Sequence, residues 1–191
     1  KAFALLILLA STAVHAQTTL QSDLPLKYIE QVHPDADPRP LVIFLHGYGS
    51  NEADLIGMKF QLPAQYNYLS VQAPLALGEG RFQWFRKKGE GAYNGETDDL
   101  KVSGQKLRDF VAQAAKKYHA APDKVYLIGF SQGAMMTYEV GLRPPVAVGG
   151  IAPCFRDIQV GGEYGTGATG GDVRLALGVV EGGLVTRRPV G

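Results

Sequence analysis

The feature that most constrains the fold is the segment 129–133, Gly-Phe-Ser-Gln-Gly, which directly follows the apolar run 125–128. The residues after it, 134–138, are compatible with a helix. A serine placed between glycines at a sharp turn from a strand into a helix has its hydroxyl lifted above the end of a parallel sheet. The pattern therefore predicts a parallel α/β fold with Ser131 as a candidate nucleophile.

The hydropathy pattern along the rest of the chain favours the same kind of sheet. Besides 125–128, strands are expected at residues 27–32, 41–45, 68–71 and 146–148, the last leading to Ile151. The run 41–45 is continuously apolar, as in a strand covered on both faces, whereas 27–32 alternates and predicts an edge strand. A helix is expected from about Thr97, because apolar residues recur at spacings of three and four. Its predicted buried face is Leu100, Leu107, Phe110, Val111, Ala114, Ala115 and Tyr118. Strands alternating with helices indicate a mainly parallel α/β sheet flanked by helices.

Composition excludes several classes of function. The chain has 191 residues, of which 46% are apolar and 19% charged, as in a globular domain. A net charge of +1 without a basic stripe argues against binding to nucleic acid. Cys154 is the single cysteine, so we expect it to be a small buried hydrophobe. No His, Cys or carboxylate cluster has metal-ligand spacing, and no glycine loop matches a phosphate cradle, so neither a metal nor a cofactor is predicted.

The N-terminus has the pattern of a signal peptide. Lys1 precedes the apolar run 2–10, and Val-His-Ala at 14–16 supplies small residues where a signal peptidase reads them. Cleavage is expected before Gln17, which makes residues 1–16 the signal peptide; a buried first helix is the alternative. The apolar run is too short for a membrane span. We therefore expect a bacterial protein that is exported to the periplasm or secreted, with no stable membrane span after cleavage.

The C-terminal segment 156–191 differs in character from residues 17–155. It holds ten of the 24 glycines, one aromatic residue and no lysine, and shows neither helix nor strand period. Such a composition buries too little apolar area to offset its chain entropy. We expect this atypical tail to result from a frameshift or a misplaced gene end. The apolar sheet edge that it would leave unpaired predicts self-association.

Four separated motifs resemble the phospholipase/carboxylesterase family of α/β-hydrolases, which includes the acyl-protein thioesterases. They are residues 45–55, 72–74 (Gln-Ala-Pro), 84–85 (Trp-Phe) and 129–135, and they occur in family order. The first reads Leu-His-Gly-Tyr-Gly-Ser-Asn-Glu-Ala-Asp-Leu and follows the apolar strand 41–45. The resemblance implies an α/β-hydrolase fold and a serine hydrolase that cleaves small carboxylic esters or thioesters through an acyl-enzyme.

The resemblance also assigns roles to individual residues. Ser131 is the implied nucleophile, and the backbone N–H groups of Tyr48 and Gln132 are the implied oxyanion donors. His46, with Gly47 and Gly49, is expected to order the oxyanion loop, and Trp84 is expected near the substrate pocket.

The chain departs from the family in the acid and base of its triad. The family places an aspartate after a later strand and a histidine in a loop near its end, whereas no histidine follows Ser131 here. Downstream aspartates are Asp157 and Asp172, and neither follows a convincing strand. The sequence therefore predicts an incomplete α/β-hydrolase with almost no turnover, because loss of the triad histidine costs about a million-fold.

The four histidines precede the serine and have other expected roles. His15 leaves with the signal peptide, His33 is expected to be solvated in a Pro/Asp loop, and His119 is expected to cap the C-terminal end of the long helix. His46 lies on the same side of the sheet as Ser131, so a substitute-base role is an alternative to loop ordering.

Two readings compete with an esterase of this family. One is a non-catalytic protein of the same fold that binds small apolar ligands or a partner. The other is a fragment of a secreted polyester or feruloyl-type esterase, which shares export and the serine turn. Gln132 and the run 134–136 fit the phospholipase/carboxylesterase pattern better.

Overall fold

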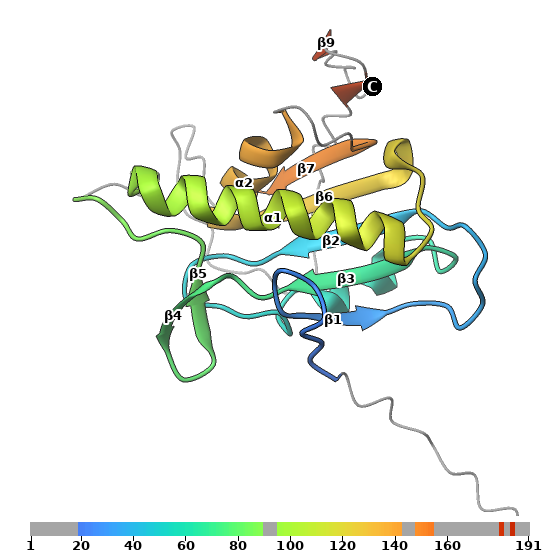
Figure 1. Cartoon of the computed structure of the whole chain (residues 1–191), viewed down its shortest axis with the longest axis horizontal. Coiled ribbons are helices and arrows are strands. Elements are labelled where there is room, and N and C mark those ends of the chain that lie inside the picture. Colours follow the sequence, from blue (N-terminus) through green and yellow to red (C-terminus); the bar gives the residue numbers. More distant parts are fainter. Residues whose placement is uncertain (1–18, 90–94, 143–147, 155–179, 182–183, 186–191) are drawn as a thin grey trace, which may run out of the picture.

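A computed structural model describes residues 19–89, 95–142 and 148–154, together with the backbone of 180–181 and 184–185. Its centre is a five-stranded sheet in the order β1-β3-β2-β6-β7 (Figure 1). The strands are β1 (Tyr28–Gln31), β2 (Leu41–Leu45), β3 (Asn67–Val71), β6 (Val125–Phe130) and β7 (Gly150–Cys154). β1 is antiparallel and lies at one edge, and every other pair is parallel. The predicted α/β sheet and its edge strand are confirmed.

The remaining elements surround this sheet. The helices are α1 (Thr97–Lys117) and α2 (Gln132–Gly141), with 3-10 helices η1 (Ile56–Gln61) and η2 (Pro122–Lys124). β4 (Leu75–Gly78) and β5 (Arg81–Gln83) form an antiparallel hairpin that the sequence did not predict, and β8 (Val180–Glu181) pairs with β9 (Leu184–Val185). Helices α1 and α2 cover one face of the sheet (Figure 1). None of the helices in the described ranges is long and apolar enough to cross a membrane.

Two expectations about the ends of the chain lie outside the described residues. The signal peptide 1–16 is one of them, and nearly all of the tail 156–191 is the other. Both stay predictions.

The last strand of the sheet, β7, begins later than expected. Its ladder with β6 starts at the pair Tyr126–Gly150. Gly149 precedes the ladder and donates its N–H to the carbonyl of Val125.

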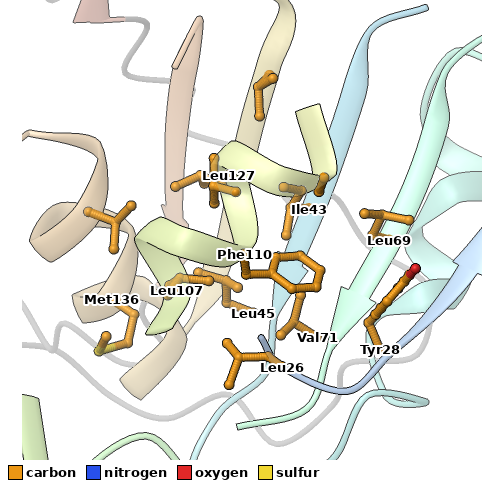
Figure 2. Packing of buried hydrophobic residues seen from close by; sticks show 14 of the residues in the cluster. Leu26, Tyr28, Ile43, Leu45, Leu69, Val71, Leu107, Phe110, Leu127 and Met136 are labelled. Carbon is orange, nitrogen blue, oxygen red and sulfur yellow. The ribbon is translucent and has the colours of Figure 1, made fainter. Parts of the chain in front are cut away.

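Strand β2 divides the core into two layers, one on each face of the sheet. Leu41, Ile43 and Leu45 face the larger cluster, and Leu107 and Phe110 of α1 pack there with Leu127 of β6 (Figure 2). Val42 and Phe44 face a smaller cluster that includes Ile56 and Met58 of η1. All five residues of β2 are buried. The continuous apolar run therefore reflects burial on both faces, as its pattern predicted.

Helix α1 begins at Thr97 as expected, with Asp98 and Asp99 in its positively polarised first turn. Its buried face includes Leu107, Phe110, Val111 and Ala114, together with Ser103 and Gly104, which hydropathy had not marked. Leu100, Ala115 and Tyr118 are partly buried against the same core.

His119 lies at the C-terminal end of α1, as expected, and caps the helix through its backbone. Helix α1 ends at Lys117, and His119 lies beyond it in the left-handed region, with φ 54°. Its backbone N–H donates to the carbonyl of Lys116, and the N–H of Ala120 donates to that of Ala115. This is a Schellman ending, in which His119 stands where glycine is usual. His119 therefore caps the helix through its backbone conformation, and the expected effect of its charge on the dipole stays a prediction.

Two buried serines provide a matched test of hydrogen bonding in the core. Ser70 of β3 is fully buried, and its hydroxyl has no hydrogen-bond partner among the described residues. Ser103 of α1 is also buried, but its hydroxyl donates to the carbonyl of Trp84 at 2.6 Å. We expect Ser70→Ala to raise the free energy of unfolding by about 1 kcal/mol and Ser103→Ala to lower it by about as much. Urea denaturation of both variants checks this, and equal losses would contradict it.

Candidate active site

Ser131 occupies a strained turn between β6 and α2. Its backbone has φ 53° and ψ −113°, a conformation that residues other than glycine rarely adopt. The N–H of Ser131 donates to the carbonyl of Cys154 at 2.9 Å, and its carbonyl accepts from the N–H of Met135 at 3.2 Å. The turn is thus held by β7 on one side and by α2 on the other. Ser131 is half-buried, and its hydroxyl has no hydrogen-bond partner within the described ranges.

The two glycines that flank the serine are required by contacts between backbones. A Cβ on Gly129 would lie 2.2 Å from the carbonyl oxygen of Gly133. A Cβ on Gly133 would lie 2.0 Å from the carbonyl oxygen of Leu45, at the end of β2. Both separations are far below van der Waals contact, and the opposing atoms belong to rigid backbone. The Gly-x-Ser-x-Gly pattern therefore records how closely α2 packs against β6 and β2.

The loop after β2 passes beside the serine. A Cβ placed on Gly47 would lie 3.4 Å from the Cβ of Ser131. The backbone N–H groups of Tyr48 and Gln132 have no hydrogen-bond partners among the described residues. Gln132 is the first residue of α2, whose N-terminal end carries partial positive charge. These features make both groups available to a developing oxyanion.

His46 is fully buried, and both of its ring nitrogens are engaged within the structure. Nε2 accepts the backbone N–H of Ala73 at 3.0 Å, so Nε2 carries no proton. The proton of the neutral ring is therefore on Nδ1, which donates to the carbonyl of Gly47 at 2.7 Å. Burial lowers the pKa of His46 and keeps this neutral form.

The bond from His46 also orients the next peptide. The Gly47 carbonyl and the Tyr48 N–H belong to one planar trans peptide, so they point in opposite directions. Fixing the carbonyl on the imidazole fixes the N–H on the other side. This geometry supports the loop-ordering role proposed for His46 and leaves it no free nitrogen for proton abstraction.

A buried network links this loop to the start of α2. The indole N–H of Trp84 donates to the carbonyl of His46 at 2.9 Å. The side-chain amide of Gln132 accepts the backbone N–H of Trp84 at 3.0 Å and donates to the carbonyl of Phe85 at 2.9 Å. Trp84 has no exposed surface, so within the described residues it positions the loop and offers no face to a ligand. Sequence reasoning missed the side-chain role of Gln132, because nothing in the local pattern pairs it with residues 84–85.

The family model for Phospholipase/Carboxylesterase matches residues 26–155, which include the turn, the oxyanion loop and the network. This chain belongs to the phospholipase/carboxylesterase family. The Bacillus subtilis (strain 168) protein MhqD, whose name assigns it to the hydrolases, is 30% identical over 94 residues, or 49% of this chain and 46% of MhqD. The chain thus spans about half the length of this curated relative.

Solved structures of two carboxylesterases agree on the fold. The carboxylesterase of Bacillus cereus is 28% identical with a TM-score of 0.56, covering 66% of this chain and 57% of its own. The carboxylesterase of Mesorhizobium loti has a TM-score of 0.60 at 20% identity, covering 73% of this chain and 67% of its own. The mainly parallel sheet flanked by helices is therefore that of an α/β-hydrolase.

The remaining predicted residues lie at different distances from the serine turn, with Cys154 beside it. His33 is partly buried, and its Nε2 lies 2.9 Å from the carbonyl of Ala64 in an exposed contact, so a solvated position is not contradicted. Cys154 ends β7 half-buried, and burial raises the pKa of its thiol, which disfavours the thiolate. Asp157 and Asp172 lie outside the described residues. Within the residues that are described, no cluster of His, Cys, Asp or Glu could hold a metal ion.

The close packing at Gly133 predicts a steep cost for a single methyl group. Gly133→Ala should lower the free energy of unfolding by at least about 3 kcal/mol, because the new Cβ collides with fixed backbone. Gly57→Ala is the matched control, since a Cβ there meets nothing within 4 Å. We expect that control to change stability by less than about 0.5 kcal/mol. Denaturant unfolding of the two variants checks the difference, and a tolerated Gly133→Ala would contradict the packing.

The environment of His46 predicts how stability depends on pH. Its pKa in the folded protein is lowered, so below about 6.5 the unfolded chain binds more protons than the folded one. The contribution of His46 is complete above pH 6.5 and is lost as the pH falls toward its folded pKa. Imidazole NMR should show the Nδ1–H tautomer and a titration midpoint below the ordinary value. A midpoint at or above 6.5 would refute the assignment.

Proposed function

We propose that this chain is a serine hydrolase by descent, which cleaves small carboxylic esters or thioesters through an acyl-Ser131 intermediate. The strained conformation of Ser131, beside a loop with a free Tyr48 N–H, is the observation that carries the proposal. Carboxylesterases among the structural relatives support the same reaction class. No cofactor is needed for this chemistry.

The proposed reaction uses groups that converge at the turn. Ser131 Oγ attacks the carbonyl carbon, and the negative charge that develops on the carbonyl oxygen is bound by the N–H groups of Tyr48 and Gln132. Collapse of the tetrahedral intermediate expels the alcohol or thiol and leaves an acyl-serine, which water then hydrolyses. Preorganised donors of this kind are each worth about 10²–10³ in turnover.

No general base for Ser131 is identified among the described residues. No histidine follows Ser131 in the 191 residues, and both nitrogens of His46 are already engaged. His33 binds the start of β3 through Asn67, at the opposite end of that strand from the serine turn. We therefore propose that this polypeptide turns over close to the rate left by binding and the oxyanion donors alone, about 10³–10⁴ above water.

The second candidate is a non-catalytic protein of the same fold that binds a small apolar ligand or a partner. It is favoured by the observation that both ring nitrogens of His46 are occupied. A fragment of a polyester or feruloyl-type esterase is a third candidate within the enzymes.

We also propose that the signal peptide 1–16 directs export of the protein, and that the protein self-associates through the sheet edge at β7.

An active-site probe separates the hydrolase from the binding protein. We expect a fluorophosphonate to label the wild-type chain slowly and Ser131→Ala not at all. Ser50→Ala is the control, because Ser50 lies in the loop that carries Tyr48 and its hydroxyl donates to Asp54 at 2.8 Å. That variant should keep the label. Absence of labelling together with no turnover of p-nitrophenyl acetate would favour the non-catalytic protein.

A further inference from the structure

Two cationic side chains contact the oxyanion loop at Tyr48 and Gly49. The ammonium of Lys87 is 4.6 Å from the centroid of the Tyr48 ring, which is 43% exposed. The guanidinium of Arg81 donates through Nε to the carbonyl of Gly49 at 3.3 Å. Both cations are exposed and come from the region of the β4–β5 hairpin, beyond the carboxyl ends of β2 and β3 (Figure 1).

The backbone of the hairpin fixes the position of Arg81 relative to the loop. The N–H of Gly49 donates to the carbonyl of Phe82 at 2.8 Å, and the N–H of Phe82 donates to the carbonyl of Ser50 at 2.9 Å. Arg81 is the neighbour of Phe82 and is therefore held in register with the loop. Arg81 is thus attached to the loop whose Tyr48 N–H is proposed to bind the oxyanion, and Lys87 contacts the same loop through the Tyr48 ring.

Neither cation is neutralised by a carboxylate among the described residues. Arg86, which precedes Lys87 in the chain, is by contrast fully paired with Asp99, through contacts of 2.8 and 3.0 Å. The two acids that follow this loop in the sequence form hydrogen bonds with neutral groups. Asp54 accepts the hydroxyl of Ser50, and Glu52 accepts the side-chain amide of Gln72. Among the described residues, Lys87 and Arg81 are therefore two cations without a carboxylate partner, and they contact the loop that carries Tyr48.

We propose that this rim is a subsite for an anionic group on the substrate, so that the preferred ester carries a carboxylate or phosphate near its carbonyl. The inference rests on the proposed function, because it places the carbonyl at Ser131 and the charge at Lys87 and Arg81. Fixed cations beside a binding site attract anions and orient them. The Tyr48 ring keeps the Lys87 ammonium in place without cancelling its charge.

The test measures binding and needs no turnover. Monomethyl succinate, which carries one carboxylate, is compared with the neutral dimethyl succinate by NMR titration of the folded chain at constant ionic strength. We expect the monoanion to bind about fivefold more tightly, as an exposed ion pair allows. Lys87→Met and Arg81→Met should each reduce that preference, and the double variant should abolish it. Lys87→Glu should reverse it.

The controls separate this subsite from general charge effects and from the proposed reaction. Lys88→Met removes a neighbouring exposed cation for which no contact with Tyr48 is found, so the preference should survive. Equal affinity for the two esters, or no binding of either, overturns the inference, as does a preference that persists in the double variant. Fluorophosphonate labelling reports on Ser131 alone. Anion preference without labelling would therefore refute only the nucleophile, and labelling without anion preference would refute only the subsite.

Discussion

The contact on which the site depends is that between the first turn of α2 and the ends of β2 and β6. At Gly133 the helix lies so close to the carbonyl of Leu45 that no side chain fits between them. This approach brings Ser131 and the loop after β2 together, since the loop begins where Leu45 ends. It also forces the chain to leave β6 abruptly, and Ser131 takes up the unusual conformation that results. The position of the serine is thus a consequence of backbone packing.

Hydrogen bonds among buried polar side chains also hold the site in place. His46, Trp84 and Gln132 are each almost or fully excluded from water, and their hydrogen-bonding groups find partners in one another or in nearby backbone. Because an unsatisfied buried polar group is costly, such a network favours one arrangement over its alternatives. It joins the loop after β2, the segment at 84–85 and the N-terminus of α2. The two proposed oxyanion donors are therefore held by a common set of contacts.

The sequence predicted those parts of the fold that have a local pattern. The apolar run 41–45 indicated burial on both faces, and the glycines around Ser131 indicated a sharp turn, because each pattern reflects the immediate surroundings of a few neighbouring residues. Partners distant in the chain could not be predicted in this way. Gln132 binds Trp84 across 48 positions, and Ser103 binds the same residue from another helix. The contact of His33 with the carbonyl of Ala64, 31 positions away, was missed for the same reason.

The state of His46 bears on whether the chain could supply its own base. To accept a proton at Nε2, the ring would have to release the N–H of Ala73, leaving that buried donor unpaired. To accept one at Nδ1, it would have to release the carbonyl of Gly47 and with it the orientation of the Tyr48 peptide. Either change disturbs the loop that is proposed to stabilise the oxyanion. One imidazole cannot both order the donors and abstract the proton. A chain with this loop therefore needs its base from a different residue, and the oxyanion half of the site is physically separable from the acid and base half.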